Sequence, residues 1–336
     1  MFKVIMNSLL IFALYACTPT SKITSKLVTE AKIEAINSKI NTLYPKASDD
    51  LQQHILSVAV KSIENMVFIE GGSYMMGDFK MPCEMDNITL VKWSPDAKCA
   101  SSINAIRYGT INLHKVTLSN YSLAKYETTY HEMNAYRLAH QLTIIDPEYN
   151  AKILQYPTPT KNWQQAKDYC TWLDELTGIP FDLPTEAQWE YAARDRGKYI
   201  YYATNDGEVR PGRIGSGYHV RLDDGSRFFV EWKKEEWNTY SGLSNIAVGS
   251  WPPNPLGIYD LAGNAAEWVN DWFSKDYYLH SPENNPQGPK TGEHKIQRGV
   301  GGERPVSTSR FIATYEGSYF SLNGFRCAVQ QPTSIH

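Results

Sequence analysis

The chain contains little cysteine: five residues among 336, at positions 17, 83, 99, 170 and 327. None lies between Cys170 and Cys327, so this long interval offers no thiolate for a soft metal ion such as Cu(I). The eight histidines lack the close spacings that place two metal ligands on one face of a helix. The sequence therefore excludes a copper–thiolate site in this interval and gives no local sign of a histidine-based redox centre.

Charge of one sign and long apolar runs are also scarce. The formal net charge is −3 at pH 7, and no extended basic or acidic segment interrupts the chain. Nothing therefore resembles the electrostatic footprint of a nucleic-acid-binding protein, and no nucleic-acid partner is expected. The apolar run Val4–Ala16 is too short to cross a bilayer, and no longer run follows it.

The N-terminal residues are typical of an export signal. Lys3 supplies a positive charge, the apolar run follows, and Ala16 directly precedes Cys17. This arrangement resembles a bacterial lipoprotein signal, which implies removal of residues 1–16 and a lipid on Cys17. The alternative is an ordinary secretory signal with a chance cysteine. Both predict export, and the first predicts a lipid anchor in the cell envelope, on the periplasmic face of the outer membrane.

Residues 17–63 are predicted to form a tether and a helical hairpin. The first helix is indicated by apolar residues at helical spacing and ends at Pro45. The second follows a cap at Asp49–Asp50. The predicted inward positions are Ile33, Ile36, Ile40 and Leu43 in the first helix, and Leu51, Ile55, Val58, Ala59 and Ile63 in the second. Such a hairpin either packs on the following domain or contacts a partner in the envelope.

The main domain is predicted over residues 64–331, with 332–336 as a tail. Strands are expected at 66–69, 114–118 and 121–127, because short apolar or alternating runs occur there. Helices are expected from the Thr128–Thr129 cap to His140, over 162–176 with Gly178 as its end, and after Thr185 with Gln188 completing a capping box. The segments 79–112, 143–159 and 197–247 are rich in loop-forming residues.

Four segments, in this order, resemble the formylglycine-generating enzyme (sulfatase-modifying factor) family. They are Met66–Gly77, Leu183–Arg194, Gly257–Trp268 and Asn323–Cys327. The resemblance covers residues 64–331. It implies an α+β fold of the formylglycine-generating type, related to C-type lectins, with much irregular structure.

The resemblance also implies how the cysteines pair. Family members join the cysteines that correspond to Cys170 and Cys327. We therefore expect Cys170–Cys327 and Cys83–Cys99 disulfides, which leaves Cys17 for lipid and suits an oxidising compartment. The alternative is free buried thiols.

The family's enzyme oxidises a cysteine of a sulfatase to formylglycine with Cu(I) and oxygen, using two cysteines. In the family these lie in the stretch that corresponds here to Arg298–Phe325, which has no cysteine. The sequence therefore predicts no copper and no formylglycine-generating activity. Arg298 and Arg326 are expected to support the fold through carbonyls and carboxylates.

Calcium is the cofactor that the resemblance implies. The ligands carried over are the side chains of Asp260 and Glu267 and the backbone carbonyls of Gly263 and Ala265. Carboxylate and carbonyl oxygens suit this hard cation. The alternative is a capped turn without an ion.

The family binds an extended peptide near the copper site, and the matching region here offers polar and aromatic side chains. The candidate groove residues are Glu303, Arg304, Ser307, Arg310, Tyr315 and Tyr319. Two functions follow. One is a non-catalytic envelope lipoprotein that binds a protein or peptide partner. The other is a variant oxidoreductase that matures a secreted protein or peptide-derived product, as some relatives without the cysteine pair do.

Overall fold

The computed structural model describes residues 23–82, 98–100, 103–145, 153–210, 217–221, 227–231, 233–236, 246–299, 307–312 and 323–336. Its α-helices are α1 (Glu30–Leu43), α2 (Asp49–Glu64), α3 (Ile103–Tyr108), α4 (Tyr130–Ala139), α5 (Trp163–Thr177), α6 (Glu186–Ala193) and α7 (Tyr277–His280). Short 3₁₀ helices lie at Ile153–Gln155 and Lys234–Glu236. Within these residues, no helix combines the length and apolarity that a membrane crossing requires.

The strands form several small sheets. They are β1 (Met66–Ile69), β2 (Gly72–Met76), β3 (Met81–Pro82), β4 (Lys98–Cys99), β5 (His114–Leu118), β6 (Tyr121–Ala124), β7 (Phe181–Asp182), β8 (Gly217–Arg221), β9 (Arg227–Glu231), β10 (Ala266–Trp272), β11 (Lys295–Arg298), β12 (Phe311–Ile312), β13 (Asn323–Phe325) and β14 (Ala328–Val329). Two sheets have four strands, in the orders β1-β6-β14-β7 and β12-β11-β10-β13. Helices and small sheets are therefore combined, which confirms the predicted α+β class.

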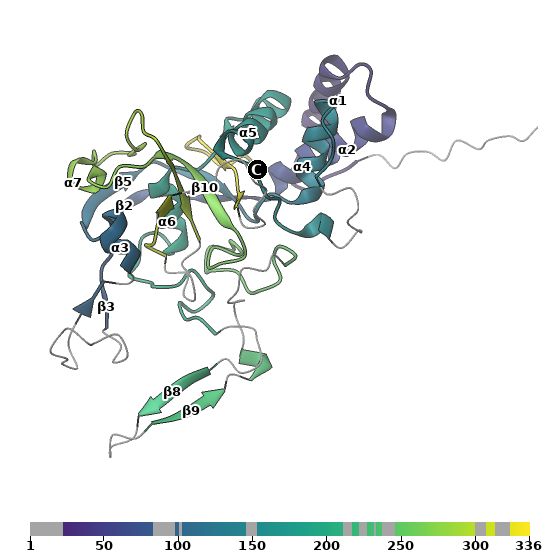
Figure 1. Cartoon of the computed structure of the whole chain (residues 1–336). Coiled ribbons are helices and arrows are strands. Elements are labelled where there is room, and N and C mark those ends of the chain that lie inside the picture. Colours follow the sequence, from purple (N-terminus) through teal and green to yellow (C-terminus); the bar gives the residue numbers. More distant parts are fainter. Residues whose placement is uncertain are drawn as a thin grey trace, which may run out of the picture.

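Strand β10 lies between two hydrophobic cores. Successive residues of a strand point to opposite faces, so Trp268 enters one core and Val269 the other, and both are fully buried. The first core joins α1, α2, α4 and α5, and the second joins β2, β5, β6 and α6. Figure 1 shows the corresponding division, with α1, α2, α4 and α5 at one end and α6 beside β10 in the middle.

The helical hairpin α1–α2 packs on the domain. Ile36, Ile40 and Ile55 are almost completely buried, in the same core as Leu173 of α5. The Trp172 indole also donates a hydrogen bond to the Tyr44 hydroxyl, 2.8 Å away, just after α1 ends. Of the two arrangements considered for the hairpin, the structure has the one in which it contacts the domain.

The helix boundaries follow from capping groups. Ser48 caps α2 and accepts from the Leu51 amide, so the predicted Asp49–Asp50 cap is wrong by one residue; the two aspartates fill the first turn. Thr129 and Thr185 begin α4 and α6 with complete capping boxes. Gly178 ends α5 in the left-handed conformation, with φ of +63°.

Two histidines face each other where α2 meets α4. The rings of His54 and His131 have centroids 4.2 Å apart, and Nε2 of His54 is buried without a hydrogen-bond partner among the described residues. The pKa of His131 is lowered to about 4, chiefly by burial and in smaller part by repulsion from the nearby His54 and Lys61. Burial also lowers the pKa of His54.

We expect this contact to weaken in acid. Folding favours the neutral rings, so the stabilisation is complete above the unfolded pKa of about 6.5 and is lost as the pH falls towards 4. Because both rings are partly exposed, we expect a loss of only about 1–2 kcal/mol between pH 7 and 4. In urea unfolding, His131→Gln should lose less stability over this range than the wild type. The exposed His280→Gln should behave as wild type, and equal losses in all three proteins would contradict the prediction.

Candidate functional site

The Asp260–Glu267 segment forms a tight loop that leads into β10. Asp260 and Asn264 both have φ of +61°, and Gly263 has φ of +122°. Asparagine and aspartate tolerate the left-handed region better than most residues, and glycine adopts it freely. The loop therefore carries polar side chains at the positions where its backbone bends, and Glu267 follows as the second residue of β10.

Glu267 is held by Arg326 in a fully buried ion pair. Its two carboxylate oxygens accept from Nη2 and Nε of Arg326, at 2.6 and 2.7 Å, and one also accepts from the Trp189 indole at 2.9 Å. Parallel pairing of β10 with β13 brings Glu267 opposite Gly324, two residues before this arginine. Arg326 also donates to the Tyr259 carbonyl. These contacts confirm that Arg326 supports the fold through a carboxylate and carbonyls.

Glu127 contacts the same loop, which the sequence motifs do not predict. Its carboxylate accepts from the Asn264 side chain at 2.7 Å and from the Ala265 amide at 2.9 Å. The residue follows β6 and is 1% exposed. In the sequence, the one sign of this contact is that Glu127 is an acidic residue at the end of a predicted apolar strand, directly before the Thr128–Thr129 helix cap.

The loop contains more negative than positive charge. Burial raises the pKa of Glu127 well above its usual range, and repulsion from Asp260 and Glu267 raises it further. Burial likewise raises the pKa of Asp260 to about 6. Burial together with neighbouring carboxylates favours either protonation or a bound cation.

Asp260 has an oxygen suited to a cation. Its Oδ2 accepts from the Gly249 amide at 2.7 Å, whereas Oδ1 is buried without a hydrogen-bond partner among the described residues. The same residues contain no group of three or more His, Cys, Asp or Glu side chains arranged to hold a metal. A calcium ion here would thus depend on the Gly263 and Ala265 carbonyls together with Asp260 and Glu267. This oxygen donor set fits calcium.

Arg298 lies in a second buried network, next to helix α6. Its guanidinium donates to Glu186 at 3.0 Å, to Glu190 at 2.9 Å and to the Ser307 carbonyl at 2.7 Å. Glu190 also pairs with Arg194 at 2.8 Å. The predicted structural role of Arg298 is confirmed.

Two of the candidate groove residues belong to the interior instead. Ser307 and Arg310 are each 1% exposed, so their predicted position in a surface groove is wrong. Ser307 donates to the Ile200 carbonyl, and Arg310 donates to Glu186 and to the Ser274 carbonyl. The other four, Glu303, Arg304, Tyr315 and Tyr319, lie outside the described residues.

The Cys170–Cys327 disulfide is present and joins α5 to the segment between β13 and β14. Cys99 is also disulfide-bonded. Its predicted partner Cys83 and the predicted lipidation site Cys17 lie outside the described residues.

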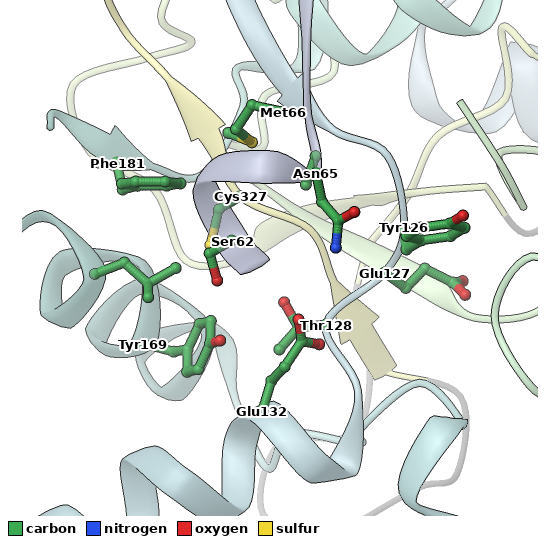
Figure 2. A pocket seen from close by; sticks show the side chains of 12 residues that line it. Ser62, Asn65, Met66, Tyr126, Glu127, Thr128, Glu132, Tyr169, Phe181 and Cys327 are labelled. Atoms are coloured by element: carbon green, nitrogen blue, oxygen red, sulfur yellow. The ribbon is translucent and has the colours of Figure 1, made fainter. Parts of the chain in front are cut away.

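A small cavity of about 30 Å³ lies where α2 meets α4 and α5, beside the disulfide. Figure 2 shows Ser62, Thr128 and Glu132 directed towards one another at its centre, with the Tyr169 hydroxyl near them. The carboxylate of Glu127 points away from this group. The volume suits one or two water molecules rather than a peptide.

Comparison with known proteins identifies the family. A family model described as "Sulfatase-modifying factor enzyme 1-like domain" matches residues 52–331. The formylglycine-generating enzyme of Streptomyces coelicolor is 35% identical over 180 residues, which cover 52% of this chain and 52% of that protein. The inactive C-alpha-formylglycine-generating enzyme 2 of Bos taurus is 34% identical over 117 residues, covering 34% of this chain and 33% of that protein.

A solved structure shows the same fold. The chain matches PvdO from Pseudomonas aeruginosa with a TM-score of 0.51 and 23% identity, over 79% of this chain and 94% of that one. At this identity the likeness establishes the fold and not the activity. The chain spans about half the length of the Streptomyces enzyme that it matches. Because the family model covers most of the chain, this protein belongs to the sulfatase-modifying factor (formylglycine-generating enzyme) family.

Proposed function

We propose that this protein is a non-catalytic, lipid-anchored member of its family that binds a protein or peptide partner at the bacterial cell envelope. One observation carries the proposal: the stretch from Arg298 to Phe325 contains no cysteine. Without two thiolates there, the Cu(I) chemistry implied by the family resemblance has no ligands in this stretch. A relative named as inactive, with comparable identity, supports the same reading.

The buried contacts of the same stretch also support a structural role. Ser307 donates a hydrogen bond to a backbone carbonyl, and Arg310 donates to Glu186 and to a second carbonyl, all inside the domain. Both side chains are buried, so neither is free to contact a substrate. What remains for a ligand is the stretch's other polar and aromatic groups. We propose that Glu303, Arg304, Tyr315 and Tyr319 contribute to the partner-binding surface, because mixed polar and aromatic groups suit peptide recognition.

The activity assay gives a direct prediction. Purified protein supplied with copper and oxygen should convert no cysteine to formylglycine in a sulfatase-motif peptide, because the thiolate pair is missing. Mass spectrometry of the peptide measures the aldehyde, and a formylglycine-generating enzyme with both cysteines serves as the positive control. Aldehyde above the level without enzyme, or stoichiometric copper or iron in the purified protein, would favour the oxidoreductase alternative.

The anchor and the partner can be tested together. We propose that Cys17 carries lipid, because it follows Ala16 at the end of the apolar run. Full-length protein should fractionate with membranes and carry an acylated Cys17, and Cys17→Ser should be released into the soluble fraction. Affinity capture from detergent-solubilised envelope should retain a partner with the wild type and with Cys17→Ser. The variant in which Tyr315 and Tyr319 are both replaced by Ala should not retain that partner. Retention by that variant would exclude the proposed surface.

We also propose that Asp260, Gly263, Ala265 and Glu267 bind calcium. The buried, unpartnered Oδ1 of Asp260 and the crowded carboxylates support this site. An ion that binds only the folded state stabilises it by about 3 kcal/mol at a hundredfold excess over its dissociation constant.

Chelation with EDTA should therefore lower the melting temperature by several degrees, and Asp260→Ala should remove most of that response. Tryptophan fluorescence should change as well, because the Trp189 indole donates to Glu267. The matched control is Asp195→Ala, since this aspartate pairs with Lys198 away from the loop and should leave the EDTA response intact. An unchanged melting curve in the wild type after chelation would show that the loop is a capped turn without a bound ion.

A further inference from the structure

We infer that Glu127 is the positioning residue of the calcium loop: it holds the backbone between the two proposed carbonyl ligands and makes the site selective for a divalent ion. The inference rests on the proposed calcium site. Glu127 lies more than a hundred residues before the loop and is not part of the ligand set that the sequence motif implies.

The hydrogen bonds of Glu127 fix the loop conformation. One carboxylate oxygen accepts from Asn264 Nδ2 and the other from the Ala265 amide, at 2.7 and 2.9 Å. Asn264 is in the left-handed conformation, and its Oδ1 accepts from the Ile246 amide at 3.0 Å. Gly263 and Ala265 flank this asparagine. A carboxylate that is hydrogen-bonded to both Asn264 and Ala265 therefore also determines where the carbonyls of Gly263 and Ala265 point.

Glu127 also determines the charge of the site. It lies with Glu267 and Asp260 around Arg326, and Glu127, Glu267 and Arg326 are each at most 1% exposed. When all three carboxylates are ionised, one guanidinium leaves two negative charges in excess. A divalent cation balances them, whereas a monovalent cation leaves one buried charge uncompensated. Without Glu127 the excess falls to one.

Each oxygen of Glu127 accepts a hydrogen bond from the loop itself, whereas one oxygen of Asp260 accepts none from the described residues, so the two residues differ in role. The buried Oδ1 of Asp260 has no hydrogen-bond partner in the described part of the chain and is available to an ion. Glu127 acts through Asn264 and Ala265, and Asp260 contacts the ion itself. Removing either residue should weaken calcium binding, but by different routes.

Calcium titration of four proteins tests the inference. Isothermal titration calorimetry with CaCl₂, after removal of bound ions, compares the wild type with Glu127→Gln, Asp260→Ala and Glu132→Gln. The last is the matched control, because Glu132 is a partly buried carboxylate that accepts from Thr129 in the α4 capping box, away from the loop. Melting temperatures in EDTA are measured alongside, to separate folding from binding.

We expect Glu127→Gln to weaken calcium binding roughly tenfold to hundredfold, the loss typical of removing a charged hydrogen-bond acceptor. Its melting temperature in EDTA should equal or exceed that of the wild type, since carboxylate repulsion is relieved. Glu132→Gln should keep the wild-type affinity. A fold-supporting role alone would lower the melting temperature in EDTA and leave the affinity unchanged, which overturns the inference.

The failure of the calcium site is distinguishable from the failure of this inference. If Asp260→Ala abolishes binding and Glu127→Gln binds as tightly as wild type, only the role of Glu127 is overturned. If the wild type binds no calcium, both fall. Should Glu127→Gln not fold, hydrogen exchange of the wild type replaces it: calcium should slow exchange of the Ala265 amide at least tenfold, and equal rates with calcium and EDTA would overturn the inference.

Discussion

Removal of the Cys170–Cys327 disulfide should lower the free energy of unfolding by about 4–5 kcal/mol. The two cysteines are 157 residues apart in sequence, and the chain-entropy model gives a loop of this length a stabilisation of that size, because the cross-link restricts the unfolded chain. The double replacement Cys170→Ala/Cys327→Ala avoids a leftover thiol in this buried position. Differential scanning calorimetry should show a melting temperature roughly 7–10 °C below that of the wild type.

The other predicted disulfide provides the comparison. Replacing Cys83 and Cys99 by alanine should cost roughly 3 kcal/mol, because the loop they would close is much shorter. The two effects should therefore differ by about 1–2 kcal/mol in the stated order. The contradicting outcome is that loss of the Cys170–Cys327 disulfide lowers the free energy of unfolding less than loss of the Cys83–Cys99 disulfide does. In that case, restriction of the unfolded chain is not the main source of the stabilisation.

Replacing Arg298 by methionine should destabilise the protein by about 3–5 kcal/mol. Methionine fills similar space but leaves Glu186 and Glu190 without a shared cation in a site from which water is excluded. Breaking a buried ion pair by removing one partner costs this much, because the remaining charges stay buried. It also removes the donor to the Ser307 carbonyl, which should loosen the chain there. Urea unfolding measures the effect.

An exposed arginine is the matched control. Arg196 pairs with Glu70 at 2.6 Å, but the two side chains are 48% and 70% exposed. Arg196→Met should therefore change stability by less than about 1 kcal/mol. Similar losses for Arg196→Met and Arg298→Met would show that the water-free setting of Arg298 is not what makes its ion pairs important.

Local patterns in the sequence predicted the longer helices and the strands β1, β5 and β6, because the forces that form them act within a few residues. The spacing of Ile33, Ile36 and Ile40 predicted the buried face of α1, and all three are buried. Thr185 with Gln188 predicted the start of α6, and both halves of that capping box are present. The resemblance supplied what such local patterns could not, namely the pairing of cysteines 157 residues apart.

The site could not be predicted in full, because its contacts join distant parts of the chain. Ser307 and Arg310 read as polar loop residues, and only the approach of Glu186 and the Ile200 carbonyl makes them interior. Glu127 meets Asn264 across 137 positions, and no periodicity connects them. The sequence identified a loop with two acids, and the fold added a third acid and an arginine.

The arrangement of the last two strands has a consequence for the order in which the molecule folds. The short segment Asn323–Val329 supplies β13 to one four-stranded sheet and β14 to the interior of the other. Neither sheet is complete until this segment has joined it, and β14 must then enter between β6 and β7. Contacts of such long sequence separation form slowly, because the loops they close are long. Docking of Asn323–Val329 thus completes both sheets, and until it occurs β6 and β7 lack the strand that joins them.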